Sequence, residues 1–149
     1  MKAKNLLGTL FILLLTFQLA YGQQQVIQSG STWVNQRGST LAIESVGTNG
    51  LIKGYYVNRA SGTGCQNVAY DLTGWIHGNA ITFTVNWDNQ TASCNSITSW
   101  TGFYYGGQIT TLWQLVVNGT TSTSQILKGE DTFSPSTDQK VFNKSLIIE

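Results

Sequence analysis

Histidine, proline and charge are scarce in this sequence. His77 is its only histidine, Pro135 is its only proline, and charged residues make up 10% of its 149 residues. Catalysis by side chains commonly needs a base together with a nucleophile or a metal cluster. One histidine in a turn-forming stretch and two cysteines do not supply a base with a nucleophile, or the ligands of a metal cluster. We therefore expect neither an enzyme nor a metal site.

An excess of positive charge is also absent once the N-terminus is set aside. Residues 1–22 contain two lysines, a leucine-rich stretch and the small-x-small cleavage site Ala20-Tyr21-Gly22, which together are typical of a signal peptide. The apolar stretch is short and has no stop-transfer continuation, which favours export over a membrane anchor. Cleavage leaves six basic residues against seven acidic ones. We therefore expect a secreted protein, extracellular or periplasmic, whose partner is neither nucleic acid nor an anionic membrane.

Cysteine is limited to Cys65 and Cys94. In the oxidising compartment that export implies, these two residues are a plausible disulfide pair. Because a sequence does not establish that two sulfur atoms lie close together, two separately buried thiols are the alternative.

Glycine, threonine, serine, asparagine and aromatic residues are plentiful, and this composition suits strands and turns better than helices. The roughly 127 residues that follow the signal peptide are enough for one domain with a core and too few for two. Eight stretches carry strand signals, with turn residues between them: Ser31–Asn35, Thr40–Glu44, Leu51–Asn58, Tyr70–Ile76, Ala80–Trp87, Asn95–Tyr105, Thr110–Val117 and Ser122–Thr132.

Eight strands fit an all-β fold, an eight-stranded antiparallel up-and-down β-barrel. We expect this domain over residues 23–133, followed by a C-terminal tail at 134–149 that loses the alternation. Periodicity alone leaves a structural β-sandwich as an equal alternative.

One expected strand has an unusual face for a barrel core. Side chains alternate along a strand, so Ser96, Thr98 and Trp100 share one face. Other strand ends also combine polar and aromatic residues, as in Trp33-Val34-Asn35 and at Trp87. A small barrel lined in this way suits a compact ligand with a hydrogen-bonding head and an apolar body.

Five motifs extend this interpretation: GSTWVNQRGSTL, GYYVNRASGTGCQN, FTVNW, NSITSWTG and KGEDTF. In this order they resemble the avidin and streptavidin family of biotin-binding barrels, and the resemblance covers essentially the whole mature chain. It is strongest with the dimeric rhizavidin-like members. The resemblance implies an avidin-like barrel that binds biotin with high affinity, uses no cofactor and forms a homodimer.

The resemblance also assigns roles to residues of this sequence. Three match the donors to the biotin ureido oxygen, namely Asn35, Ser39 and Tyr56. Asn58 and Asp131 match acceptors for the two ureido N–H groups. Thr98 matches a hydroxyl that contacts the ring sulfur, and Ser96 matches one that contacts the valerate carboxylate. The residues that match the walls around the apolar body of biotin are Trp87, Trp100, Trp113 and Leu115.

Three departures from the tetrameric members stand out. Where those members carry a tryptophan that reaches into a neighbouring subunit's pocket, this chain has Thr123 or a neighbour of it. Asn58 stands where they carry serine or threonine, and Arg37 stands where they often carry an apolar residue. We expect a Cys65–Cys94 disulfide to replace the missing lid by pinning the pocket-mouth loops.

Two other function classes stay open from the residues themselves. A secreted carbohydrate-binding module also uses tryptophan platforms with asparagine, aspartate and hydroxyl groups. A structural or adhesive β module buries its tryptophans without any ligand.

Overall fold

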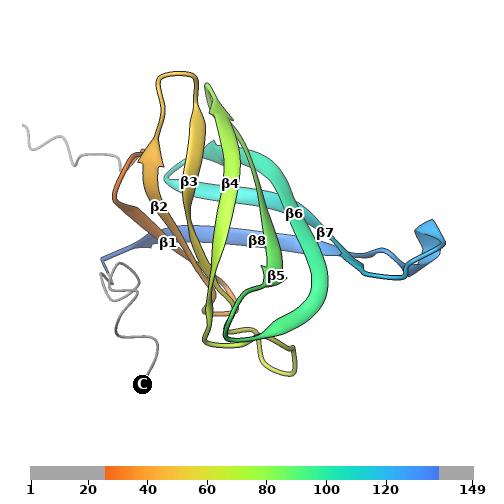
Figure 1. Ribbon diagram of the computed structural model, residues 1–149. Helices are drawn as coiled ribbons and strands as arrows, with labels where there is room; N and C mark the ends of the chain where they lie inside the picture. Colours follow the sequence, from red (N-terminus) through yellow and green to blue (C-terminus); the bar gives the residue numbers. More distant parts are fainter. Residues whose placement is uncertain (1–25, 138–149) are drawn as a thin grey trace, which may run out of the picture.

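The structure is a computed structural model that describes residues 26–137, and these residues form a closed antiparallel barrel in which each strand pairs with the next and the last pairs with the first (Figure 1). The strands are β1 (Ser31–Asn35), β2 (Thr40–Val46), β3 (Leu51–Val57), β4 (Ala69–His77), β5 (Ala80–Asp88), β6 (Ser93–Tyr105), β7 (Gln108–Val117) and β8 (Leu127–Ser136). The expected eight-stranded up-and-down barrel is therefore confirmed, and the sandwich alternative is wrong.

Alternation of apolar and polar residues explains why these segments close into a barrel. Along β5, Ile81, Phe83, Val85 and Trp87 are buried while the residues between them are more exposed. Successive strand side chains point to opposite faces, so an apolar row such as that of β5 faces the interior and helps to fill it. Burial of each large side chain contributes about 1.5–3 kcal/mol to folding.

Glycine allows two strands to approach closely at one point of this wall. A Cβ at Gly74 would lie 1.9 Å from the carbonyl oxygen of Thr82 on the neighbouring strand β5. Only a residue without a side chain fits there, and such glycines are common where a strand bends.

The eighth strand differs from the expectation at both of its ends. It begins at Leu127 instead of Ser122, because Thr123–Gln125 form a 3-10 helix, η1, with a capping box. The Ser122 side chain accepts from the Ser124 backbone, and the Gln125 side chain accepts from the Ser122 backbone N–H at 3.0 Å. These bonds satisfy the backbone locally and compete with strand pairing.

At its other end, β8 continues to Ser136, beyond the barrel boundary expected at Phe133. Thr32, Trp33 and Val34 of β1 pair with Ser136, Pro135 and Ser134. The barrel thus needs these three residues to close against β1. The expected signal peptide, residues 1–22, and the tail from residue 138 onward lie outside the described residues.

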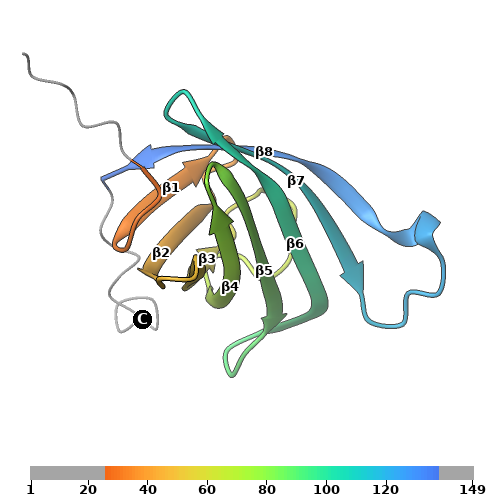
Figure 2. The ribbon, with the colours of Figure 1, turned by 90° about the horizontal axis from the view of Figure 1, so that it is seen from above.

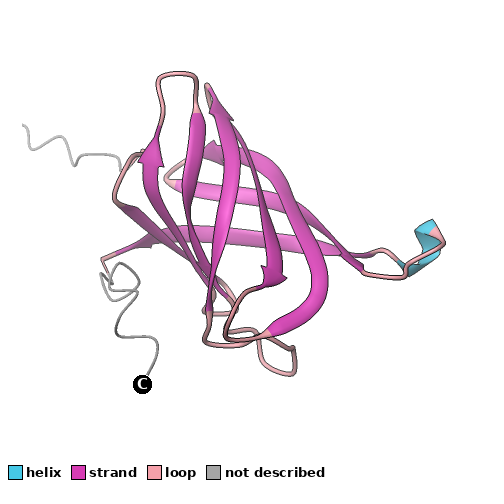
Figure 3. Cartoon of the chain, in the orientation of Figure 1, coloured by secondary structure: helices cyan, strands magenta, loops and turns pink. Residues whose placement is uncertain are grey.

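The connection between β7 and β8, which contains η1, projects away from the barrel body (Figure 2). Strand dominates the described chain, and η1 is the one helical segment there (Figure 3). Within residues 26–137 no helix is long and apolar enough to cross a membrane.

Candidate functional site

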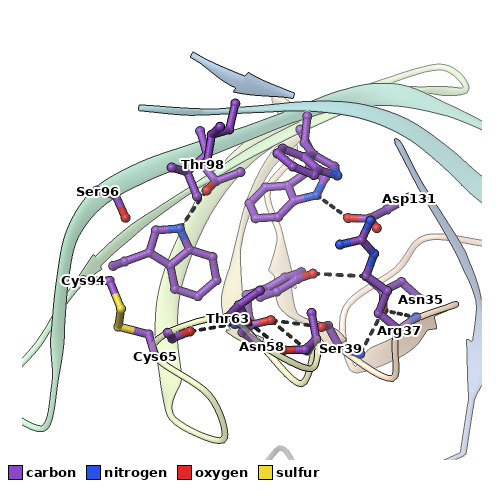
Figure 4. Close-up of a pocket in the computed structure, with 18 residues that line it drawn as sticks. Asn35, Arg37, Ser39, Asn58, Thr63, Cys65, Cys94, Ser96, Thr98 and Asp131 are labelled. Atoms are coloured by element: carbon purple, nitrogen blue, oxygen red, sulfur yellow. Dashed lines mark hydrogen bonds between the residues drawn. A yellow bond between two sulfur atoms is a disulfide. The ribbon is translucent and has the colours of Figure 1, made fainter. Parts of the chain in front are cut away.

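A cavity of about 350 Å³ opens at the barrel end where β1, β3 and β5 finish and β6 begins (Figure 4). All eleven residues singled out from the sequence line it, together with Cys65 and Cys94. Five further residues line it: Arg37, which the sequence marked as a departure from the tetrameric members, and four residues with no expected role, Ala60, Thr63, Gly64 and Leu127. The cavity explains the unusual face of the expected strand, because Ser96, Thr98 and Trp100 of β6 are buried and line it.

Asn35 is oriented by the turn that follows β1. Its Oδ1 accepts hydrogen bonds from the backbone N–H groups of Arg37 at 3.0 Å and Ser39 at 2.8 Å. Its Nδ2 donates to the Tyr56 hydroxyl at 3.4 Å. Because both acceptor sites of Oδ1 are occupied by the turn, the amide N–H groups are the part of Asn35 that faces the cavity.

The Tyr56 hydroxyl is held in its protonated form. Burial raises the pKa of Tyr56 well above its ordinary value of 10.0, and the nearby Asp131 carboxylate raises it further. A protonated phenol keeps its O–H as a donor. Tyr56 therefore presents a hydroxyl donor beside the Asn35 amide.

Ser39 and Asn58 connect this polar end to the loop between β3 and β4. Ser39 Oγ accepts from the Arg59 backbone N–H at 2.9 Å and donates to Asn58 Oδ1 at 3.4 Å. Asn58 Nδ2 donates to Thr63 Oγ1 and to the Gly64 carbonyl, both at 2.8 Å. The loop therefore uses both amide protons of Asn58, and Asn58 Oδ1 accepts from the Ala60 backbone N–H at 3.0 Å as well as from Ser39.

A disulfide joins this loop to the start of β6. Cys65 and Cys94 are bonded, with their Cα atoms 6.1 Å apart, which confirms the expected pair. Gln66 adds a second restraint, because its Nε2 donates to the carbonyls of Ala60 at 2.8 Å and Thr63 at 2.9 Å. The loop is therefore held both covalently and by hydrogen bonds at the mouth of the cavity.

Asp131 is the buried carboxylate of the site, with 4% of its surface exposed. Its Oδ2 accepts from Trp100 Nε1 at 2.9 Å, and its Oδ1 accepts from Gln36 Nε2 at 3.1 Å. Burial raises the pKa of Asp131 above its ordinary value of 3.8, while these two hydrogen bonds, the Arg37 charge and a hydrogen bond from the Asn35 side chain oppose the rise.

Gln36 was missed by the sequence reasoning. Besides Asp131, it bonds the Glu130 carbonyl at 3.0 Å and accepts from the Thr132 backbone N–H at 3.0 Å. It clamps the β1–β2 turn onto β8 through three contacts. An exposed glutamine in a turn carries no sequence signal for such a role, since the partner lies more than ninety residues away.

Aromatic rings form the apolar part of the cavity. The Tyr56 ring lies 4.8 Å from that of Trp100 and 5.7 Å from that of Trp87, the latter edge-on. Phe83 stacks on Trp100 at 4.9 Å and supports that ring from within the core. These contacts fix the walls before any ligand arrives.

One hydroxyl sits among these rings in a defined orientation. Trp87 Nε1 donates to Thr98 Oγ1 at 2.7 Å. Because Thr98 accepts from the indole, its own proton is directed elsewhere and is a candidate donor to a ligand atom. Near the mouth, Trp113 and Leu115 of β7 are half-buried and Leu127 of β8 is 56% exposed, so this side of the cavity is open.

This arrangement places donors and a carboxylate acceptor at one end and aromatic walls along the rest. It suits a compact ligand with a carbonyl flanked by N–H groups and an apolar body. No group of three or more histidine, cysteine, aspartate or glutamate side chains is placed to hold a metal ion within residues 26–137.

Comparison with known proteins gives consistent matches. The family model described as the avidin family matches residues 23–136. Afifavidin of Afifella pfennigii is 49% identical over 108 residues, which span 70% of this chain and 67% of afifavidin. Hoefavidin of Hoeflea phototrophica is 35% identical over 136 residues, which span 84% of this chain and 81% of hoefavidin.

Solved structures agree with these sequence matches. A crystal structure of a shwanavidin variant in complex with biotin superimposes with a TM-score of 0.74 at 55% identity, covering 75% of this chain and 99% of that chain. The rhizavidin–biotin complex gives a TM-score of 0.65 at 45% identity, covering 73% of this chain and 92% of that chain.

Proposed function

Because this chain belongs to the avidin family, we propose that it binds biotin with high affinity, and without catalysis, in the cavity at the end of its barrel. The observation that carries the proposal is the convergence of the Asn35 amide and the Tyr56 hydroxyl at the polar end, beside Asp131. The shwanavidin variant and rhizavidin, which match most of this chain, both form complexes with biotin of known structure.

The ureido group of biotin occupies the polar end in this proposal. Its oxygen accepts from Asn35, Ser39 and Tyr56, and three donors on one oxygen stabilise its charge-separated form in a dry site. Asn58 Oδ1 and the Asp131 carboxylate accept from the two ureido N–H groups. The amide orientation of Asn58 supports this assignment, because both of its N–H groups are already bonded to the loop.

The rest of biotin lies along the aromatic walls. Thr98 directs its hydroxyl proton to the ring sulfur, and Ser96, nearer the mouth, meets the valerate carboxylate. The apolar body packs against the remaining wall residues, which are Trp87, Trp100, Trp113 and Leu115. Burial of a ligand of this size against rigid aromatic surface needs little further ordering of the protein, which favours tight binding.

Thermal unfolding of the mature, oxidised protein with and without excess biotin tests the proposal. A ligand that binds only the folded state at a thousand times its Kd adds about 4 kcal/mol of stability, which raises the midpoint by about 10 °C or more in a domain of this size. A panel of simple sugars serves as the control and should leave the midpoint unchanged. If the protein is folded and its thermal unfolding midpoint does not change when biotin is added, the proposal is overturned.

A homodimer is the second part of the proposal. The outer face of β6 and β7 exposes large apolar side chains, among them Ile97 at 50%, Phe103 at 48% and Leu112 at 63%. Ile97 lies directly opposite Val116 in the strand register, so the exposed side chains are neighbours. Contiguous apolar surface of this kind marks an interaction site. Sedimentation of the wild type should give a dimer and that of Leu112→Glu a monomer; a monomeric wild type would contradict the proposal.

Export to an extracellular or periplasmic compartment is the third part. The disulfide supports it, because such bonds persist in oxidising environments. Expression of the full chain in a bacterial host tests it: the exported protein should begin after Gly22, as determined by intact mass. A product that stays in the cytoplasm with residues 1–22 attached would contradict it.

A further inference from the structure

The cavity contains one cationic and one anionic side chain among its eighteen lining residues, Arg37 and Asp131. They come from different parts of the chain, the β1–β2 turn and strand β8. Figure 4 shows the Arg37 side chain extending from the turn toward Asp131 at the polar end of the cavity. The Arg37 charge also acts electrostatically on Asp131, so both charges influence the polar end of the cavity.

The position of Arg37 follows from the turn that holds it. Its backbone N–H donates to Asn35 Oδ1 at 3.0 Å, and Gly38 then turns the chain with a φ of 82°. These contacts involve only the main chain of Arg37, so residues other than proline, which lacks the backbone N–H, keep them at this position. The guanidinium itself is exposed at the rim and does not support the core.

The guanidinium acts on both functional groups beside it. Burial raises the pKa of both Asp131 and Tyr56, and the Arg37 charge opposes this rise at each of them, because it makes the electrostatic potential there more positive. A guanidinium is charged at every physiological pH. With Arg37 present, the two charges at the polar end balance; without it, the single charge of Asp131 is left there.

We propose that Arg37 is a specificity-determining residue, which makes the polar end of the cavity select a neutral cyclic urea over a ligand with a cationic head group. The inference rests on the proposed binding of biotin and extends it to the choice between related ligands. A urea oxygen gains from positive potential as its bond polarises, whereas a cationic guanidine in the same place is repelled.

The test uses biotin and 2-iminobiotin, whose guanidine head group carries a positive charge at neutral pH. Dissociation constants for both ligands are measured with the wild type, Arg37→Gln, Arg37→Lys and the control Lys53→Gln. Lys53 is an exposed cation on β3 that does not line the cavity, so its removal changes the net charge equally. Unliganded thermal midpoints confirm that each variant folds.

Arg37→Gln should weaken the binding of biotin and leave the binding of 2-iminobiotin unchanged or make it tighter. The ratio of the 2-iminobiotin dissociation constant to the biotin dissociation constant should therefore fall about tenfold, or about 1.4 kcal/mol. Arg37→Lys and Lys53→Gln should keep the wild-type ratio. Because the guanidinium is exposed, the wild-type ratio should also fall toward that of Arg37→Gln in about 1 M salt.

Failure of the role of Arg37 can be distinguished from failure of the proposed function. A wild type that binds biotin tightly, with a ratio unchanged in Arg37→Gln, overturns the role of Arg37 and leaves biotin binding intact. A folded wild type that does not bind biotin overturns the proposed function itself.

Discussion

Trp100 and Asp131 are joined by a hydrogen bond between strands that are not neighbours in the barrel, with Trp100 Nε1 2.9 Å from Asp131 Oδ2. Trp100 lies on β6 and Asp131 on β8, and β7 runs between them. One side chain is an apolar wall of the cavity and the other is its buried acceptor. The bond therefore couples the two halves of the site.

Trp100→Phe keeps an aromatic wall and removes this bond. Loss of a hydrogen bond to a buried charged group costs about 1.5–3 kcal/mol, so biotin affinity should fall by about tenfold to a hundredfold. Titration calorimetry with a competing weak ligand measures the loss. Trp113→Phe is the matched control, because it trims a neighbouring indole that does not bond Asp131. Equal effects of the two variants would show that the bond contributes nothing beyond packing.

Biotin affinity should depend on pH through Asp131. Burial holds its pKa above 3.8 in the unliganded protein, whereas an accepted ureido N–H favours the ionised form. Binding therefore releases a proton, and affinity should rise as pH increases through the raised pKa and level off above it. Dissociation constants between about pH 4 and 8 check this, and Asp131→Asn should flatten the profile. An affinity that rises as pH falls would contradict the assignment.

The stability of the unliganded protein should show the opposite trend from the same group. Because the folded pKa of Asp131 is raised above the unfolded value, the folded state binds more protons between the two values. The contribution of Asp131 to stability is greatest below the unfolded pKa and is lost as pH rises through the folded one. Urea unfolding across this range, with Asp131→Asn as the reference, measures the difference.

The Cys65–Cys94 bond should slow biotin dissociation. It closes a loop with a sequence separation of 29 and holds the β3–β4 loop at the cavity mouth. In the entropic account, its loss destabilises the fold by about 3–4 kcal/mol. Reduction, or Cys65→Ser with Cys94→Ser, should also raise the biotin off-rate, which competition with unlabelled biotin measures. An off-rate that stays the same after verified reduction would show that the hydrogen bonds of Gln66 and Asn58 hold the loop unaided.

Gln36 should set the pH dependence of the site although it does not line the cavity. Its bond to Asp131 lowers the pKa of that carboxyl, so Gln36→Ala should move the rise of biotin affinity to higher pH. Gln108→Ala removes a comparable exposed bond, from Gln108 Nε2 to Ser134 Oγ at 3.1 Å, and is the control. A weaker affinity with an unshifted pH profile would mean that Gln36 acts on the turn and not on the carboxylate.

The local sequence pattern was sufficient to predict the positions of the strands and most of the residues that line the cavity. Alternation along β6 placed Ser96, Thr98 and Trp100 on one face, and the structure buries that face against the cavity. The motifs that resemble the avidin family supplied the residues from the other strands. Such predictions succeed because the period of two along a strand is a property of the backbone and does not depend on distant contacts.

Other features depended on which segments meet. Thr123–Gln125 form a 3-10 helix because side-chain caps satisfy the backbone there, and β8 extends to Ser136 because β1 needs a partner to close the barrel. The clamp of Gln36 on Asp131 likewise joins residues far apart in the chain. The sequence by itself determined the barrel strands, the inward faces and the cysteine pair as a candidate. Only the tertiary structure decided where the barrel closes, which groups hold the buried carboxylate and where the Arg37 charge lies, because each depends on strands brought together by closure.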